Sequence, residues 1–524
     1  MGKVNSKSIV FRIIRLIIYT GCFTGVILFL NEYDNVVFET QRAGKGAWAF
    51  LFFGIALLAM QRVRWLNWQS ALVTVLYIPV AILECKIYVS SADLLLPNIL
   101  SCITQWMTLM VVTDMVVTGR VRKIRKFRLF AFTMLCISTA LLLAYTRGQS
   151  VDKYLMFVVM CLIPLNEEDW DEVMDGLLLA GLISFIYVTA VSFMVNPYFG
   201  VPKEEFMKKN PEQGGRWYGY FMNIGTFGQY LGLSSALAVC GIFRSREKWG
   251  RLSAPYFISW FWLAGSVFLS ALNATRNYMV GMAGLIIILF IFGFRKSKTR
   301  GYVIRGAIVT VLIAAAGFAI IRFGMWVLSP EFDQNQLTDM LMKTPLKLVP
   351  SGTKYVVNKF VLAHNGYDSG FEGYNPFPPY SIWSFLNILT SMRLGIGYEF
   401  IRQTAWEAST GDGIQYGTYF AYNAHNQYVQ ALYVFGFFAG GTYILYVLST
   451  WVLSIAECIK TRRNQFYLAL ILITVMVAMW LGERSTIYYP LTFVGLFAAY
   501  PILVNCLSSK KSGGLESKGT CLII

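Results

Sequence analysis

The residue best suited to proton transfer in this 524-residue chain is His425, one of only two histidines. It lies in the stretch Ala424-His425-Asn426-Gln427, where a long polar region gives way to an apolar segment. Histidine is the side chain most easily used as a proton acceptor near neutral pH, so His425 is the first candidate for a general base. Asn426 either orients this histidine or caps the helix that follows, and both interpretations stay open.

Two arginines are candidates for binding phosphate oxygens, because a guanidinium group can donate two parallel hydrogen bonds. Arg216 lies in a glycine- and aromatic-rich stretch, and Arg276 begins an apolar segment after a tight turn. Taken singly, each arginine could be an interfacial residue that reaches lipid headgroups, and His425 could be an interfacial residue too. Together the three favour chemistry on a phosphorylated lipid whose headgroup faces outward.

Other kinds of chemistry find little support in the residue pattern. The two histidines are far apart, and no pair of the nine cysteines has metal or disulfide spacing. There is no glycine-rich phosphate loop with its lysine. We therefore predict no metal and no cofactor, and keep His364 as a second proton carrier and Glu399 and Glu407 as rival bases.

The composition predicts an all-α membrane protein that crosses the bilayer many times. Hydrophobic residues make up 56% of the chain and charged residues only 14%, whereas soluble domains carry about 25% charged residues. Apolar runs long enough to span a bilayer recur along the whole chain, about 14 in number. They lie near 10–30, 46–60, 68–89, 94–117, 129–145, 154–165, 173–195, 223–243, 254–272, 277–294, 303–325, 426–452, 465–481 and 487–506. The net charge of +17 comes from short basic runs between these segments, which argues against a nucleic-acid partner.

The basic runs also predict the orientation in the membrane, because lysine and arginine concentrate in cytoplasmic loops. With the N-terminus inside, alternating spans place every strongly basic run and the C-terminal tail in the cytoplasm. Arg216, Arg276 and His425 then all lie outside. The acidic run at 167–172 is interpreted as a solvated cytoplasmic turn.

The same segmentation divides the chain into four parts. Residues 1–327 form transmembrane helices 1–11 and carry Arg216 and Arg276 on the outer face. Residues 328–424 form one large extracytoplasmic loop, whose many aromatic residues argue against disorder. Residues 425–506 form helices 12–14, and residues 507–524 form a cytoplasmic tail.

Four motifs resemble the O-antigen ligase and O-antigen polymerase family. His425-Asn426 followed after eleven positions by Gly436 is similar to the family's histidine signature, and Thr275-Arg276-Asn277 is similar to its arginine motif. The stretches Arg216 to Asn223 and Leu394 to Tyr398 resemble an earlier arginine motif and a late glycine pair. The chain departs from the family at Val434, where a glutamate is common, and at 223–225, where many members have Asn-Pro-Asn.

The resemblance implies a membrane glycosyltransferase with a GT-C-like architecture. The implied reaction moves a glycan from an undecaprenyl-pyrophosphate carrier to a sugar hydroxyl, without metal, inverting the anomeric carbon, outside the bacterial cytoplasmic membrane. Arg216 and Arg276 would bind the pyrophosphate and His425 would act as base, with Asn426 and Tyr398 at the substrate. Implied partners are the sugar acceptor, the bilayer, a flippase and a chain-length regulator.

Two other classes of protein remain as alternatives. A lipid-linked oligosaccharide flippase would place charges within its spans and have short outer loops, unlike this chain. A scaffold protein of the cell envelope would need neither the arginines nor the histidine. Polymerase is preferred to ligase, because nothing in the large loop resembles a dedicated lipid A core site. Tyr367, Tyr374, Tyr380 and Trp383 are candidates for stacking on sugar or for packing the loop.

Overall fold

The computed structural model is predominantly helical in the residues that it describes. These residues are single positions between 102 and 117 and between 491 and 499, together with 6–29, 68–88, 167–195, 219–221, 224–273, 275–293, 376–378, 381–389, 393–406, 413–417, 419–421, 423–461 and 464–482.

Four helices are long and apolar enough to cross a membrane, which agrees with the predicted membrane location. They are α1 (Ser6–Phe29), α7 (Glu167–Val195), α9 (Ile224–Trp249) and α17 (Gln427–Thr461). Shorter apolar helices are α3 (Trp68–Tyr88), α10 (Ala254–Asn273), α11 (Arg276–Gly293) and α18 (Asn464–Met479). The bounds of α3, α10, α11 and α18 agree closely with the predicted segments. The segments predicted near 46–60, 129–145, 154–165 and 303–325 and the tail 507–524 lie outside the described residues.

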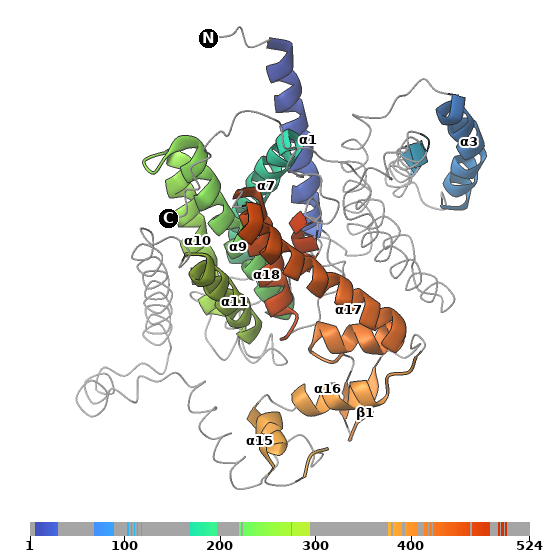
Figure 1. Cartoon of the computed structure of the whole chain (residues 1–524), viewed down its shortest axis with the longest axis vertical. Coiled ribbons are helices and arrows are strands. Elements are labelled where there is room, and N and C mark those ends of the chain that lie inside the picture. The colour runs from blue at the N-terminus through green and yellow to red at the C-terminus, as the bar shows by residue number, and fades with distance from the viewer. Residues whose placement is uncertain are drawn as a thin grey trace.

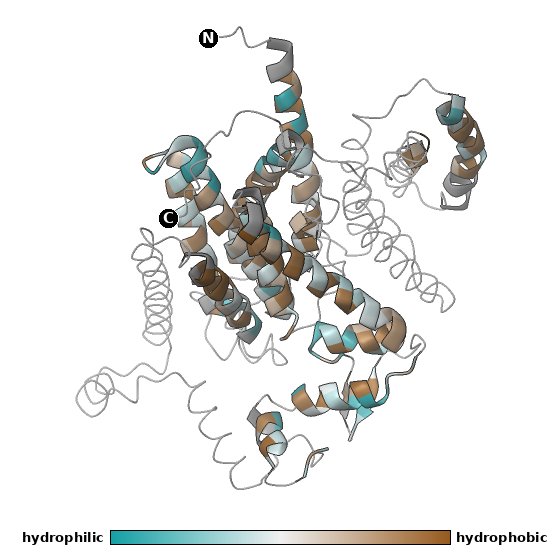
Figure 2. Cartoon of the chain, in the orientation of Figure 1, coloured by the Kyte–Doolittle hydropathy of each residue, from teal (hydrophilic) through white to brown (hydrophobic). Residues whose placement is uncertain are grey.

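Helix α9 forms the centre of the described bundle, with α7, α10, α11 and α18 packed around it (Figure 1). Small residues allow this close packing, as is usual between membrane helices. A side chain at Gly228 would collide with Thr275, and one at Gly232 with Met479. Inside the bundle Ser234 accepts a hydrogen bond from the Trp262 indole at 2.8 Å. Figure 2 shows hydrophobic residues along most of α11 and hydrophilic ones at the turn between α9 and α10.

One end of the bundle, at the top of Figure 1, is held by ion pairs among α1, α7 and α9. Arg15 binds Glu172 with its Nε at 2.9 Å, and the buried Arg244 lies 3.2 Å from Asp171 and 3.1 Å from Asp175. The acidic run interpreted as a solvated turn therefore opens α7 as part of that helix. Its carboxylates bind arginines across the helix interfaces. We call Arg15, Asp171, Glu172, Asp175 and Arg244 the ion-paired end.

At the other end, part of the predicted large loop folds into α15 (Ile382–Leu389), α16 (Arg393–Arg402) and a hairpin of β1 (Ile414–Tyr416) and β2 (Tyr419–Ala421). The strands are antiparallel, with Gln415 opposite Phe420. A short 3-10 helix, η4 (Gly219–Phe221), precedes α9. Hydrophobic residues of α16, the hairpin and α17 form a small core of their own beside the bundle.

The predicted span near 426–452 differs from a single straight helix, because α17 bends sharply at Gly436. The backbone there has φ 79° and ψ 168°, a conformation open essentially to glycine alone. The bend frees the Phe437 amide to donate to the Ala405 carbonyl at 2.9 Å. It also brings Gly440 against the backbone of Ala431 and Leu432, where a side chain would collide. The bend thus sets the first part of α17 apart as a short helix that starts at Gln427, two residues after His425.

Candidate functional site

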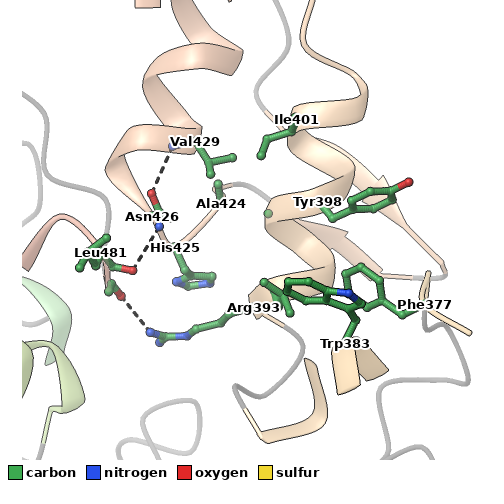
Figure 3. Close-up of a pocket in the computed structure, with 13 residues that line it drawn as sticks. Phe377, Trp383, Arg393, Tyr398, Ile401, Ala424, His425, Asn426, Val429 and Leu481 are labelled. Atoms are coloured by element: carbon green, nitrogen blue, oxygen red, sulfur yellow. Dashed lines mark hydrogen bonds between the residues drawn. The ribbon is translucent and has the colours of Figure 1, made fainter. Parts of the chain in front are cut away.

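A pocket of about 780 Å³ opens at the start of α17, bounded by α16 and the end of α18 (Figure 3). Its size lies within the range of small-ligand sites, about 300–1,000 Å³. The residues that line it are Phe377, Trp383, Arg393, Leu394, Gly397, Tyr398, Ile401, Ala424, His425, Asn426, Val429, Leu481 and Gly482. Cationic and polar groups therefore share one pocket with aromatic rings from the large loop.

His425 lines this pocket and has an unusual backbone. Among the residues that the structure describes, it is the only residue other than glycine with a positive φ, at 48°. Such a conformation costs about 1–2 kcal/mol for an ordinary residue. The Asn423 side-chain oxygen accepts a hydrogen bond from the His425 amide at 3.0 Å, which stabilises the tight turn. The turn holds the imidazole at the pocket, where Figure 3 shows it beside Arg393.

Asn426 acts as the N-cap of α17. Its side-chain oxygen accepts hydrogen bonds from the amides of Tyr428 at 2.9 Å and Val429 at 3.2 Å. Its side-chain nitrogen donates to the Leu481 carbonyl at 3.3 Å. Of the two roles left open by the sequence, capping is the one that the structure contains, and it fixes the turn that holds His425.

The three residues that follow α18 connect the elements around the pocket through their backbone carbonyls. The Trp480 carbonyl accepts a hydrogen bond from the Gln427 amide at 2.9 Å, and the Leu481 carbonyl accepts the Asn426 contact. The Gly482 carbonyl accepts a hydrogen bond from Arg393 at 2.9 Å. Carbonyls at the end of a helix lack intrahelical partners, so they are available to bind the start of α17 and the loop helix α16.

Arg393 is the site residue that the sequence reasoning missed. It begins α16 and brings a guanidinium group from the large loop into the pocket with His425 (Figure 3). The signal was its position directly before the segment Leu394 to Tyr398, which was already singled out for its glycine pair. An arginine in an outer loop has many ordinary roles, and only the fold places this one beside the histidine.

The backbone of Arg276 lies at the same end of the bundle as the pocket. Arg276 begins α11, and a methyl group on Gly482 would lie 3.0 Å from the Asn277 side-chain oxygen. The first turn of α11 therefore lies beside the same α18 terminus that Arg393 and Asn426 contact. The start of α11 and His425 therefore both lie near the α18 terminus. Arg216 and the side chain of Arg276 lie outside the described residues.

The predicted glycine pair has two separate roles. The amide of Gly395 donates to the Asn387 side-chain oxygen at 2.6 Å. A side chain at Gly395 would collide with Asn387 and Tyr416, so glycine is required for packing. Gly397 lines the pocket, and a methyl group there would meet nothing within 4 Å. Tyr398, predicted at the substrate, also lines the pocket, on the side of Phe377 and Trp383 (Figure 3).

Among the three rival proton carriers, only Glu399 lies within the described residues. Its side chain is 4% exposed and pairs with Arg402 at 3.4 Å. It is absent from the residues that line the pocket, which makes a structural role the better interpretation of this carboxylate. His364 and Glu407 lie outside the described residues.

Comparison with known proteins gives no relative of this chain. No protein-family model, no curated protein and no solved structure matches it.

Proposed function

We propose that this protein is a membrane glycosyltransferase that resembles the O-antigen polymerase and ligase family. It would transfer or polymerise glycan from an undecaprenyl-pyrophosphate donor onto a sugar hydroxyl, with polymerase preferred to ligase. One observation carries the proposal. His425, held in a left-handed turn at the start of α17, shares a pocket with the guanidinium of Arg393 near the first turn of α11.

The proposed reaction is a single displacement at the anomeric carbon. The acceptor hydroxyl forms the new C–O bond, the bond from carbon to the pyrophosphate oxygen breaks, and the configuration inverts. His425 accepts the hydroxyl proton, a contribution of about 10²–10⁴-fold in rate. The donor is already activated, so the step needs no nucleotide, metal or other cofactor.

The negative charge that develops on the leaving pyrophosphate requires fixed cationic groups. Arg216 and Arg276 take this role in the proposal, and Arg393 adds a third guanidinium from the large loop. Prepositioned charges of this kind often supply the largest share of catalysis. Asn426 is a positioning residue, since its polar atoms hold the turn and the α18 terminus.

The proposal includes the wider architecture expected from the sequence. This comprises about 14 transmembrane helices in a GT-C-like arrangement, both termini in the cytoplasm and the site outside the bacterial inner membrane. The ion-paired end and the pocket lie at different ends of the bundle (Figure 1). This separation supports the proposed orientation, in which the two ends face different sides of the membrane.

Glycan transfer by purified protein in nanodiscs tests the proposal. The donor is a synthetic undecaprenyl-pyrophosphate oligosaccharide, with no metal or nucleotide added, and the products are separated by size. Wild type should lengthen the glycan or glycosylate an acceptor, and both Arg276→Ala and His425→Ala should abolish this at matched folding. Transfer that survives both substitutions would overturn the site. Passage of the donor across the bilayer without transfer would indicate a flippase instead.

A further inference from the structure

Three aromatic side chains form one wall of the pocket, opposite its cationic end. Phe377 lies 5.4 Å from Tyr398 and 6.5 Å from Trp383, measured between ring centroids. They come from three different segments, namely the stretch 376–378, α15 and α16. Trp383 and Tyr398 are exposed. We call these three residues the aromatic wall.

Helix α15 presents Trp383 outward and its polar residues inward. Ile382 and Trp383 are exposed, while Ser384 and Asn387 are buried. Asn387 accepts a hydrogen bond from the Gly395 amide and donates one to the Tyr416 hydroxyl at 3.4 Å. Polar contacts thus hold the helix in this orientation. Burying a large apolar side chain stabilises a fold, and the exposed Trp383 does not contribute in this way.

An aromatic surface next to polar groups is what recognition of sugar requires. Sugar rings carry apolar C–H faces that pack on aromatic rings, and hydroxyl groups that need hydrogen-bond partners. The pocket offers the aromatic wall for the first need, and Arg393, His425 and the Gly482 carbonyl for the second. A lipid chain could pack on the rings, but it has no polar groups to bind Arg393 and His425.

We infer that Phe377, Trp383 and Tyr398 form a carbohydrate subsite that holds sugar rings of the glycan beside His425 and Arg393. The subsite rests on the proposed function for the reaction that it serves. Binding of free glycan can be measured without that reaction. Its specificity comes from the large loop, because all three rings belong to segments within 328–424.

Gly397 provides a substitution that acts on the pocket alone. A methyl group there would meet no neighbour within 4 Å, and Gly397 lines the pocket on the same helix as Tyr398. Gly397→Ala should therefore leave the fold intact and reduce the space available to a sugar ring. Gly441 in α17 is also open to a methyl group and lies away from the lining residues. Gly441→Ala is the matched control.

The experiment measures binding of free oligosaccharides to the full chain in nanodiscs. An array of bacterial oligosaccharides without lipid or pyrophosphate is probed with wild type, and the best-retained glycan is titrated into 5-fluorotryptophan-labelled protein. The ¹⁹F signal missing from Trp383→Phe identifies Trp383. The glycan should shift this signal, and Trp383→Ala should lower the affinity about tenfold. Gly397→Ala should weaken binding, and Gly441→Ala should not.

The outcomes separate this inference from the proposed reaction. Retained glycan binding in His425→Ala, where transfer is lost, would support both. Glycan binding to wild type with no transfer from any donor would support the subsite alone. Failure of every glycan to bind, or broadening of the Trp383 signal by spin-labelled lipid with no glycan response, would overturn the subsite and identify a lipid-facing surface.

Discussion

The two ends of the described bundle place their charged groups in different surroundings. At the ion-paired end, arginines of α1 and α9 bind carboxylates of α7, so each charge has an opposite charge beside it. At the pocket end, Arg393 and Asn426 instead bind backbone carbonyls of α18, and the cationic group lines an open cavity. Ion pairs between helices stabilise the fold, whereas a guanidinium group that lines a cavity can also contact a ligand there.

Backbone strain also distinguishes the pocket end from the ion-paired end. His425 at the pocket end has a left-handed backbone, and its turn is held by Asn423, by the α17 cap and by the α18 terminus. Unfavourable backbone conformations persist where surrounding contacts determine them, and they gather at functional sites. The comparison therefore predicts that substitutions at the pocket end reduce activity, and that those at the ion-paired end reduce stability.

Substitution of His425 should have the largest effect on activity. His425→Ala should lower glycan transfer about 10²–10⁴-fold, because the proposed proton acceptor is lost. His425→Gly should lower transfer equally, yet should fold at least as well as the alanine variant, because glycine adopts a positive φ without strain. Transfer rates and thermal unfolding in nanodiscs check both. Full activity in the glycine variant would show that the turn matters and the imidazole does not.

Arg244→Met should produce the largest loss of stability. The Arg244 side chain is 7% exposed and lies between Asp171 and Asp175, and truncating one partner of a buried ion pair costs about 3–5 kcal/mol. Thermal unfolding should fall sharply, while transfer per folded molecule stays near wild type. Glu247→Gln is the control, since this carboxylate is 41% exposed and 3.9 Å from Arg244. A selective loss of transfer in Arg244→Met would contradict the division between the two ends.

Arg393→Gln should affect the donor more than the fold. Hydrogen bonds to charged groups are worth about 1.5–3 kcal/mol, so transfer should fall roughly 10–150-fold by the relation of 1.4 kcal/mol per factor of ten. Arg393→Lys should recover part of this loss, because it restores the charge but not the planar fork of donors. Steady-state transfer at varied donor concentration measures both variants. Equal activity of the glutamine and lysine variants would remove Arg393 from charge stabilisation.

The sequence predicted helix positions well and the site only in part. Apolar runs gave the bounds of α3, α10, α11 and α18 to within a few residues, because a bilayer span leaves a strong local signal. His425 and Asn426 were singled out by type and position and Tyr398 by the family resemblance, and all three line one pocket. Arg393 was missed, because its importance depends on a contact with Gly482 that is distant in sequence.

The acidic run at 167–172 shows a second reason why the sequence prediction was incomplete. Its composition is typical of a solvated turn, and only the packing of α1 and α9 against α7 converts its carboxylates into ion pairs. The bend in α17 is a similar case. A single glycine inside an apolar run is compatible with a straight helix, and it is the contacts of the neighbouring segments that determine the bend.

Gly436→Ala should have the smallest effect of these substitutions. It should lower both the stability of the fold and the transfer activity. The glycine-only conformation at φ 79° and ψ 168° would cost an alanine about 1–3 kcal/mol. If α17 straightened to relieve the strain, Phe437 would lose its bond to Ala405, and the start of the helix would move relative to Arg393. Thermal unfolding and transfer should therefore fall together. Gly441→Ala, five residues further along and open to a methyl group, should change neither, and an equal effect of the two substitutions would show that the bend does not position His425.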